Sequence, residues 1–248
     1  MNSYKKWSDS QESSNNQPKA VLAYNAIRKA IITMSLEPGT TLSEKEICAQ
    51  YNISRTPVRE AVLRLSQEGL VNVIPGEGTF VSKISVRSVI EGQIVRSSLE
   101  LRMARLAART YLTEFEKEFD LIMYLQSDAA KRRDYDEAFS IDNSFHQLIC
   151  KVAGFPNVWR TIHNSIGQLD RVRYRAFPQS GYFDAMVGEH QAIYNAIRNH
   201  DEDLSCQLMR SHLDDIARML SLVMEENPNI IIQEEDMDIL SALRTPYS

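Results

Sequence analysis

The chain has 248 residues, of which 43% are hydrophobic and 25% charged, and its formal net charge is -5. This composition is that of a globular protein with one large domain or two smaller ones, and it excludes collagen-like, low-complexity and wholly disordered chains. No stretch approaches the ~18 consecutive apolar residues of a transmembrane helix.

The N-terminus and the cysteines indicate the compartment. The first residues are polar and lack the apolar core of a signal peptide. The cysteines, Cys48, Cys150 and Cys206, are scattered and predict no disulfide framework, which fits a reducing environment. We therefore expect a cytoplasmic protein.

The charges are distributed unevenly along the chain. Residues 1–83 carry 10 Lys and Arg against 8 Asp and Glu, whereas the remaining residues carry 18 against 25. A mildly basic first third followed by an acidic body indicates two modules with different partners. This asymmetry permits DNA binding without demonstrating it.

The chain begins with a polar tail and an amphipathic helix. Residues 1–19 are rich in Ser, Asn and Gln and predict a disordered tail. From Ala20 to Ile31 apolar residues recur at three- and four-residue steps, which predicts a helix. The sequence Glu37-Pro38-Gly39-Thr40 then predicts a turn.

Two further helices follow in the first third. Ser43 and Glu46 form a capping box, which predicts a short helix from about Glu44 to Gln50. A third helix is expected from Arg55 to about Glu68, closed by Gly69 in the left-handed conformation.

A β-hairpin completes this region. Val71–Val73 and Thr79–Val81 predict two short strands around the Gly-rich turn Pro75–Gly78. Three helices and a hairpin in this order predict a winged helix-turn-helix domain over residues 20–83, with a linker at Ser82–Ser85.

Residues 86–226 predict helices almost throughout, separated by clusters of Gly, Pro and Asn. Apolar residues recur at helical spacing in Val89–Arg109, Phe115–Arg132, Ala138–Val152, Phe183–Arg198 and Leu204–Met224. We expect a mainly α protein in which an all-α bundle of six or seven helices follows the winged domain. The acidic segment 227–248, with its Ile-Ile-Ile run, stays unassigned.

The start of the third predicted helix is suited to reading DNA. Arg55 and Arg59 lie on one helical face, and Pro57 is tolerated in the first turn. In the major groove Arg forks onto guanine, and each bidentate pair contributes about 1–3 kcal/mol of discrimination. The hydroxyls of Ser54 and Thr56 suit phosphate oxygens. From spacing alone, the two arginines also fit a solvated helix face.

Further residues occur in fixed order around this helix: Ile27-Arg28, Glu37-Pro38-Gly39, Leu42-Ser43-Glu44, Ser54-Arg55-Thr56-Pro57-Val58-Arg59-Glu60-Ala61, Leu65, Glu68-Gly69-Leu70 and Gly78-Thr79-Phe80-Val81. With them the segment 23–83 closely resembles the DNA-binding domain of the GntR family of bacterial transcription regulators. The resemblance implies base or phosphate contacts at Lys45, Arg55, Thr56 and Arg59, with the wing glycines Gly76 and Gly78 near the minor groove. Because the family often has Arg where this chain has Lys45, a phosphate contact is expected there.

Histidines and one aspartate form a candidate metal site. Asp142 and His146 are one helical turn apart, whereas His190 and His212 lie on two other predicted helices and would have to converge. Three imidazoles and one carboxylate suit zinc, nickel, manganese or iron. By spacing alone, Asp142 and His146 would equally fit a capping or surface pair.

The residues around these positions are Asp142-Asn143-Ser144-Phe145-His146, Glu189-His190 with Ile193 and Ala196-Ile197, and Met209 with His212-Leu213. They resemble the FCD ligand-binding domain of the FadR-type GntR subfamily, in which the matching Asp and His positions hold a divalent metal at the floor of a cavity. The resemblance implies a divalent metal, with zinc preferred, at Asp142, His146, His190 and His212. His163 and His200 match nothing and are expected at the surface.

Cationic residues indicate an anionic effector. Arg96 begins the R-x-x-x-E pattern of the family's first effector-domain helix, and Arg171, Arg173 and Tyr174 form a cationic and hydroxyl run. Arginine forks onto carboxylate, so these residues together with a metal imply a small carboxylate or sugar acid. The whole-chain pattern also resembles regulators of sugar-acid or sugar-alcohol catabolism. The same arginine run fits a solvated or ion-paired helix face.

We therefore expect a DNA-binding transcriptional regulator, and specifically a repressor of a catabolic operon, that binds a pseudopalindromic operator as a homodimer. The effector would act through the linker. One alternative is a metal-dependent enzyme acting on hydroxy-acids with an accessory N-terminal domain. The sequence shows no nucleophile–base pair, so we expect no enzyme activity. A second alternative is a purely structural metal.

Overall fold

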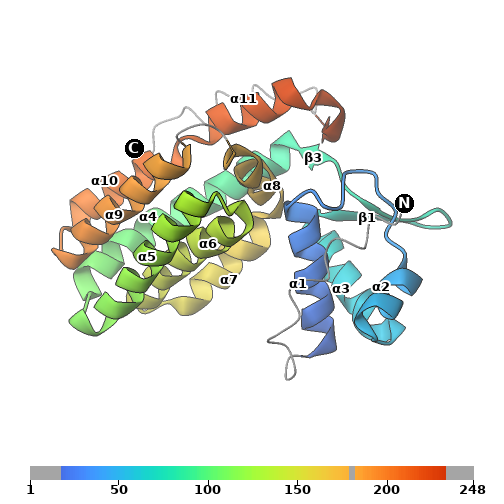
Figure 1. The fold of residues 1–248 in the computed structure, drawn as a ribbon, viewed down its shortest axis with the longest axis horizontal. Helices are drawn as coiled ribbons and strands as arrows, with labels where there is room; N and C mark the ends of the chain where they lie inside the picture. The colour runs from blue at the N-terminus through green and yellow to red at the C-terminus, as the bar shows by residue number, and fades with distance from the viewer. Residues whose placement is uncertain (1–17, 179–181, 233–248) are drawn as a thin grey trace.

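The structure, a computed structural model, describes residues 18–178 and 182–232. Apart from Pro18 and Lys19, the tail predicted over residues 1–19 lies outside the described residues, and so does the segment after residue 232. Lys19 already belongs to the first helix. In Figure 1 the described chain forms an N-terminal part (residues 18–83) beside a larger helical body (residues 86–226).

The N-terminal part contains the elements α1 (Lys19–Ile32), α2 (Glu44–Tyr51), α3 (Arg55–Gln67), β1 (Val71–Ile74) and β2 (Gly78–Val81). The Ser43 hydroxyl accepts a hydrogen bond from the Glu46 amide (3.3 Å), as the capping box predicts. The two strands are antiparallel, and their turn uses Gly76 at a φ of 81°. The predicted winged helix-turn-helix is confirmed, with the hairpin projecting from one end of the molecule (Figure 1).

The helical body contains α4 (Val86–Thr110), the 3-10 turn η2 (Thr113–Phe115), α5 (Glu116–Arg132), α6 (Tyr135–Val152), α7 (Pro156–Ser165), α8 (Gly167–Ala176), α9 (Tyr182–Arg198), α10 (Glu202–Leu213) and α11 (Ile216–Glu226). The all-α bundle is confirmed, although it has more helices than the six or seven expected. The predicted stretch 204–224 divides between Leu213 and Ile216. A second break, at Ile166, separates α7 from α8. Gly167 begins α8 and packs on Leu70, because a Cβ at this position would lie only 3.1 Å from the Leu70 side chain. Among the described helices, none is long and apolar enough to cross a bilayer.

The predicted linker is part of a small sheet. Ile84–Ser85 forms β3, which pairs in parallel with β4 (Ile231–Ile232), after the 3-10 turn η3 (Pro228–Ile230). The isoleucine run that the sequence left unassigned therefore supplies β4. The Ser82 hydroxyl also donates to the Gly69 carbonyl (2.6 Å). These contacts hold the linker against both parts of the protein.

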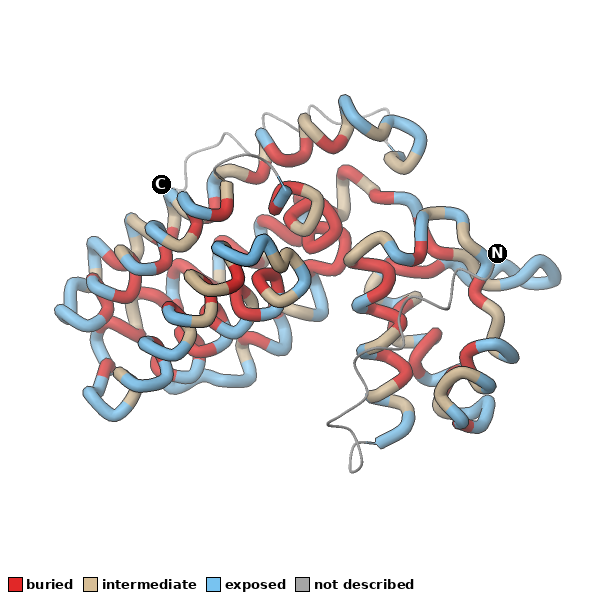
Figure 2. Tube along the Cα trace, in the orientation of Figure 1, coloured by how far each residue is buried: buried red, intermediate tan, exposed pale blue. Residues whose placement is uncertain are grey.

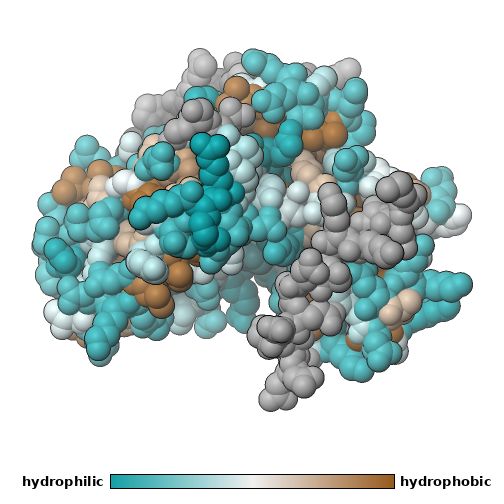
Figure 3. Space-filling model, in the orientation of Figure 1, coloured by the Kyte–Doolittle hydropathy of each residue, from teal (hydrophilic) through white to brown (hydrophobic). Residues whose placement is uncertain are grey.

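Helix α8 lies where the two parts meet. It packs against α1 of the N-terminal part and against α4 and α11 of the helical body. Figure 2 shows α8 as a largely buried element near the centre of the molecule. By contrast, the coloured surface seen in Figure 3 is mostly hydrophilic. Charged residues on α8 are therefore placed inside the protein.

Candidate nucleic-acid interface and metal centre

The predicted DNA-contacting residues are all exposed on the N-terminal part. Val58, Val62 and Leu65 bury the opposite face of α3. These predicted DNA-contacting residues are Lys45, Ser54, Arg55, Thr56, Arg59, Gly76 and Gly78. We call this set the reading face. It contains the N-terminus of α3, whose backbone amides and helix dipole favour phosphate oxygens.

Two local features leave the reading face available to a ligand. Ser54 is the N-cap residue of α3, yet its side chain makes no capping hydrogen bond, and the first turn contains no acidic residue. Arg59 contacts Glu44 (Nε to Oε2, 3.1 Å) in an exposed pair. Such surface pairs contribute only about 0–1 kcal/mol, so a phosphate or a guanine can displace Glu44.

The four predicted metal ligands converge inside the helical body. Asp142 and His146 come from α6, His190 from α9 and His212 from α10, and one potential ligand atom from each lies within 4.8 Å of the others. His190 Nε2 is 3.2 Å from His212 Nε2 and 3.6 Å from Asp142 Oδ1. Imidazoles that bind one zinc ion at about 2.1 Å have nitrogens at about this separation. We call these four residues the donor cluster.

Each imidazole of the donor cluster has a partner at its second nitrogen, Nδ1. His146 Nδ1 lies 2.5 Å from Glu100 Oε2, His190 Nδ1 donates to the Gln126 amide oxygen (3.1 Å), and His212 Nδ1 donates to Glu189 Oε2 (2.7 Å). Phe145 also stacks on the His190 ring at 3.9 Å. Partners of this kind fix the ring orientation and leave Nε2 of His190 and of His212 for a metal. Arg96 Nη2 lies 2.7 Å from His146 Nε2 and has to move aside for a cation to bind there. Glu100 and Gln126 were not predicted in this role, because they lie on helices distant in sequence from the histidines they contact.

The charge states of the buried donors also suit a cation. Burial lowers the pKa of His146 and of His190 well below the usual value, so both imidazoles are neutral. Burial alone would raise the pKa of Asp142, but the positive charges of the neighbouring Arg173 and Arg96 outweigh it and lower that pKa. Neutral imidazoles and an ionised carboxylate are the forms in which these side chains bind metals.

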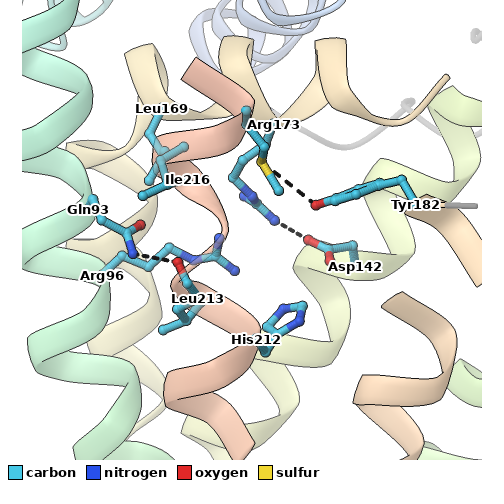
Figure 4. Close-up of a pocket in the computed structure, with 10 residues that line it drawn as sticks. Gln93, Arg96, Asp142, Leu169, Arg173, Tyr182, His212, Leu213 and Ile216 are labelled. Atoms are coloured by element: carbon cyan, nitrogen blue, oxygen red, sulfur yellow. Dashed lines mark hydrogen bonds and ion pairs between the residues drawn. The ribbon is translucent and has the colours of Figure 1, made fainter. Parts of the chain in front are cut away.

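A polar cavity opens on the donor cluster (Figure 4). Its lining consists of Gln93, Arg96, Asp142, Leu169, Arg173, Tyr182, His212, Leu213, Ile216 and Met219. Arg173 reaches from α8 to form an ion pair with Asp142, and Arg96 reaches from α4 to His146 Nε2 (2.7 Å). The cavity therefore combines two guanidinium groups, a tyrosine hydroxyl and the donor cluster.

Two of the predicted effector-binding residues, Arg171 and Tyr174, do not line this cavity. Arg171 is fully buried and donates to the Ser82 carbonyl (2.9 Å), while Tyr174 donates to Asp136 (2.5 Å). Successive helical residues point about 100° apart, so one run on α8 does not direct all its side chains into one cavity. Tyr182, which follows the undescribed residues 179–181, lines the cavity and was not foreseen.

The remaining histidines differ from one another. His200 is exposed, as expected, whereas His163 on α7 is only half-exposed. Its backbone carbonyl accepts a hydrogen bond from Arg28 Nη2 of α1 (3.1 Å). Burial, together with the positive charge of Arg28, lowers the pKa of the His163 imidazole to about 4. His163 therefore belongs to the contact between the two parts of the protein.

Comparisons with known proteins identify the two parts of the chain as known domains. Residues 20–81 match the family "Bacterial regulatory proteins, gntR family", and residues 93–215 match the "FCD domain". The HTH-type transcriptional repressor RspR of Escherichia coli is 33% identical over 88% of this chain and 96% of its own length. The gluconate operon transcriptional repressor of Bacillus subtilis is 25% identical over 77% of this chain and 80% of its own length.

Solved structures show the same fold. The Escherichia coli protein McbR/YncC aligns with a TM-score of 0.74 at 19% identity, over 83% of this chain and 99% of its own. A GntR regulator from Rhodococcus aligns with a TM-score of 0.68 at 22% identity, over 82% and 98% of the two chains. At these identities the likeness concerns the fold alone.

We expect acid to weaken the folded state through His163. The pKa of an imidazole is about 6.5 in an unfolded chain, above the value of about 4 in the folded protein. The unfolded state therefore binds the proton first as the pH falls, and stability is lost between pH about 6.5 and about 4. Urea unfolding at pH 7 and at pH 5 should show wild type losing about 1–2 kcal/mol more than His163→Gln. Equal losses in the two proteins would contradict this assignment.

Proposed function

Because the chain belongs to the gntR family of bacterial regulatory proteins and carries an FCD domain, we propose that it is a transcriptional repressor controlled by a small anion. Members of this family regulate transcription, so the hydroxy-acid enzyme considered from the sequence is set aside. We assign operator binding to residues 20–83, and effector binding and dimerisation to residues 86–226. The names of the two relatives, both repressors, support the direction of control. Such a protein acts in the cytoplasm, where bacterial DNA lies.

In this proposal the reading face contacts the operator. Arg55 and Arg59 at the exposed start of α3 contact bases in the major groove, while Lys45, Ser54 and Thr56 contact phosphates. The wing with Gly76 and Gly78 lies near the minor groove. A homodimer presents two copies of α3, which matches a pseudopalindromic operator. The observation that carries this assignment is an exposed helix N-terminus with two arginines and no acidic residue in its first turn.

The donor cluster is proposed to bind one divalent metal ion. The paired Nδ1 atoms and the 3.2 Å separation of His190 Nε2 from His212 Nε2 support a single shared cation. Three nitrogen donors and one oxygen donor favour zinc, with nickel, manganese or iron as alternatives. A bound metal with an open position supplies a Lewis-acidic anchor for an anion.

The effector is proposed to be a small carboxylate, and a sugar acid in particular. Arg96 and Arg173 line the cavity and provide forked donors for a carboxylate, and Tyr182 provides a hydroxyl. The relative named as a gluconate operon repressor supports a sugar acid and a catabolic operon. The positions of Arg171 and Tyr174 place them outside the proposed effector contacts.

The operator proposal is tested with Arg55→Ala, Arg59→Ala. We expect at least about 30-fold weaker binding to DNA fragments selected by the wild-type protein, because each bidentate arginine contributes about 1–3 kcal/mol. Fluorescence anisotropy at fixed salt measures this change. The control Arg102→Ala, Arg160→Ala removes the same charge from exposed positions of the helical body and should bind like wild type. Unchanged specific binding by the first variant would refute the assignment of the reading face.

The metal proposal is tested by elemental analysis of purified protein. We expect one divalent ion per chain in wild type and none in His146→Ala, His190→Ala, because two of four donors are lost. His200→Asn is the matched control, since His200 lies outside the cluster and asparagine tolerates its φ of 58°. The proposal fails if wild type contains no ion, or if the double variant keeps it.

A further inference from the structure

A network of consecutive ion pairs, which we call the ion-pair network, extends from the end of α3 to the donor cluster. Glu68, which follows α3, contacts Arg28 of α1 (Oε2 to Nε, 3.4 Å). Arg28 contacts Asp170 of α8 (Nη2 to Oδ2, 2.9 Å). The other oxygen of Asp170 accepts from Arg173 (Nη1 to Oδ1, 2.7 Å), and Arg173 forms the ion pair with Asp142. Five side chains thus connect the N-terminal part with a predicted metal ligand.

All five side chains are buried. Their exposed fractions are at most 8%, and the side chain of Asp170 has none. A buried charge that loses its partner cannot be compensated by water, so leaving it unpaired is strongly unfavourable. A change at one member must therefore be met by a rearrangement of its neighbours. The ion-pair network is therefore suited to transmit a rearrangement between Glu68 and Asp142.

The carboxylate of Asp170 contacts side chains from both parts of the protein. Its two oxygens are divided between Arg28 of the N-terminal part and Arg173 of the cavity. We propose that Asp170 couples occupancy of the cavity to the position of α1 and α3. The proposal rests on the metal centre proposed above and names how that site reaches the reading face.

The coupling follows from competition for carboxylates. A cation held by Asp142 competes with Arg173 for that carboxylate, so Arg173 turns more fully to Asp170. Asp170 then holds Arg28 less tightly and leaves it to Glu68, at the C-terminal end of α3. Because coupling between two sites is reciprocal, the state of Arg28 must also change the affinity of the donor cluster for a cation.

The test measures Zn²⁺ affinity of the full-length chain by competition with a chromophoric chelator. Four proteins form a cycle: wild type, Arg28→Met, Asp170→Asn and the double variant. We expect Arg28→Met to bind Zn²⁺ about 5-fold or more tightly, since Asp170 then draws Arg173 away from Asp142. In the Asp170→Asn background the same substitution should have no effect, because the connection is already cut.

The controls separate this coupling from simpler effects. Loss of a positive charge acting through space would tighten binding by the same factor in both backgrounds, and this result would overturn the proposal. Lys29→Met removes the same charge from the next residue, whose side chain is 57% exposed, and should leave the affinity within about 2-fold. Absence of Zn²⁺ binding in wild type contradicts the metal centre itself. Binding in wild type that is unchanged by Arg28→Met contradicts the coupling alone.

The variants are chosen to keep the fold. Without Arg28, Glu68 keeps Tyr24 (2.7 Å) and Arg64 (3.2 Å), and Asp170 keeps Arg173. If Arg28→Met does not fold, Arg28→Lys keeps the charge but cannot fork, and a weaker change in the same direction is expected. Hydrogen exchange gives a second readout: Zn²⁺ should alter amide protection in α1 of wild type and not of Asp170→Asn. Unaltered protection in Zn²⁺-bound wild type would overturn the proposal.

Discussion

Burial of the Asp142 carboxylate is the constraint around which the interior of the helical body is built. Its side chain is 2% exposed, and an anion removed from water in this way is stable only when cations or a metal compensate it. Arg173 from α8 supplies one positive charge, and Arg96 from α4 lies nearby against His146. Imidazoles from α6, α9 and α10 close the remaining sides. Five helices therefore meet at this buried polar centre.

The reading face follows the opposite physical rule. Its arginines are exposed, so their interactions with other side chains are weak and screened by salt. They remain able to bind phosphates, which carry high charge density, and the acceptor atoms of bases. The strong electrostatic interactions of the protein are kept inside, along α8. This division lets the surface exchange partners readily, while the interior changes only when a buried charge gains or loses a partner.

The sequence predicted those features that depend on local spacing. The capping box at Ser43, the arginine pair on α3 and the Asp142–His146 turn are all set within one helical turn, and the resemblance to known families placed the distant histidines. The course of α8 was not predictable, because which of Arg171 and Arg173 enters the cavity depends on how the helix packs against α1 and α4. The pairing of β4 with the linker also joins residues far apart in sequence, and no short pattern encodes it.

The most direct test of this account is anomalous X-ray diffraction at the absorption edge of the bound metal, on crystals of the full-length protein. The account predicts one anomalous peak per chain, within bonding distance (about 2.0–2.2 Å) of Nε2 of His146, His190 and His212 and of an Asp142 oxygen. A peak at any other place in the chain, or a cluster whose imidazoles bond only to one another and to Arg96, would contradict it.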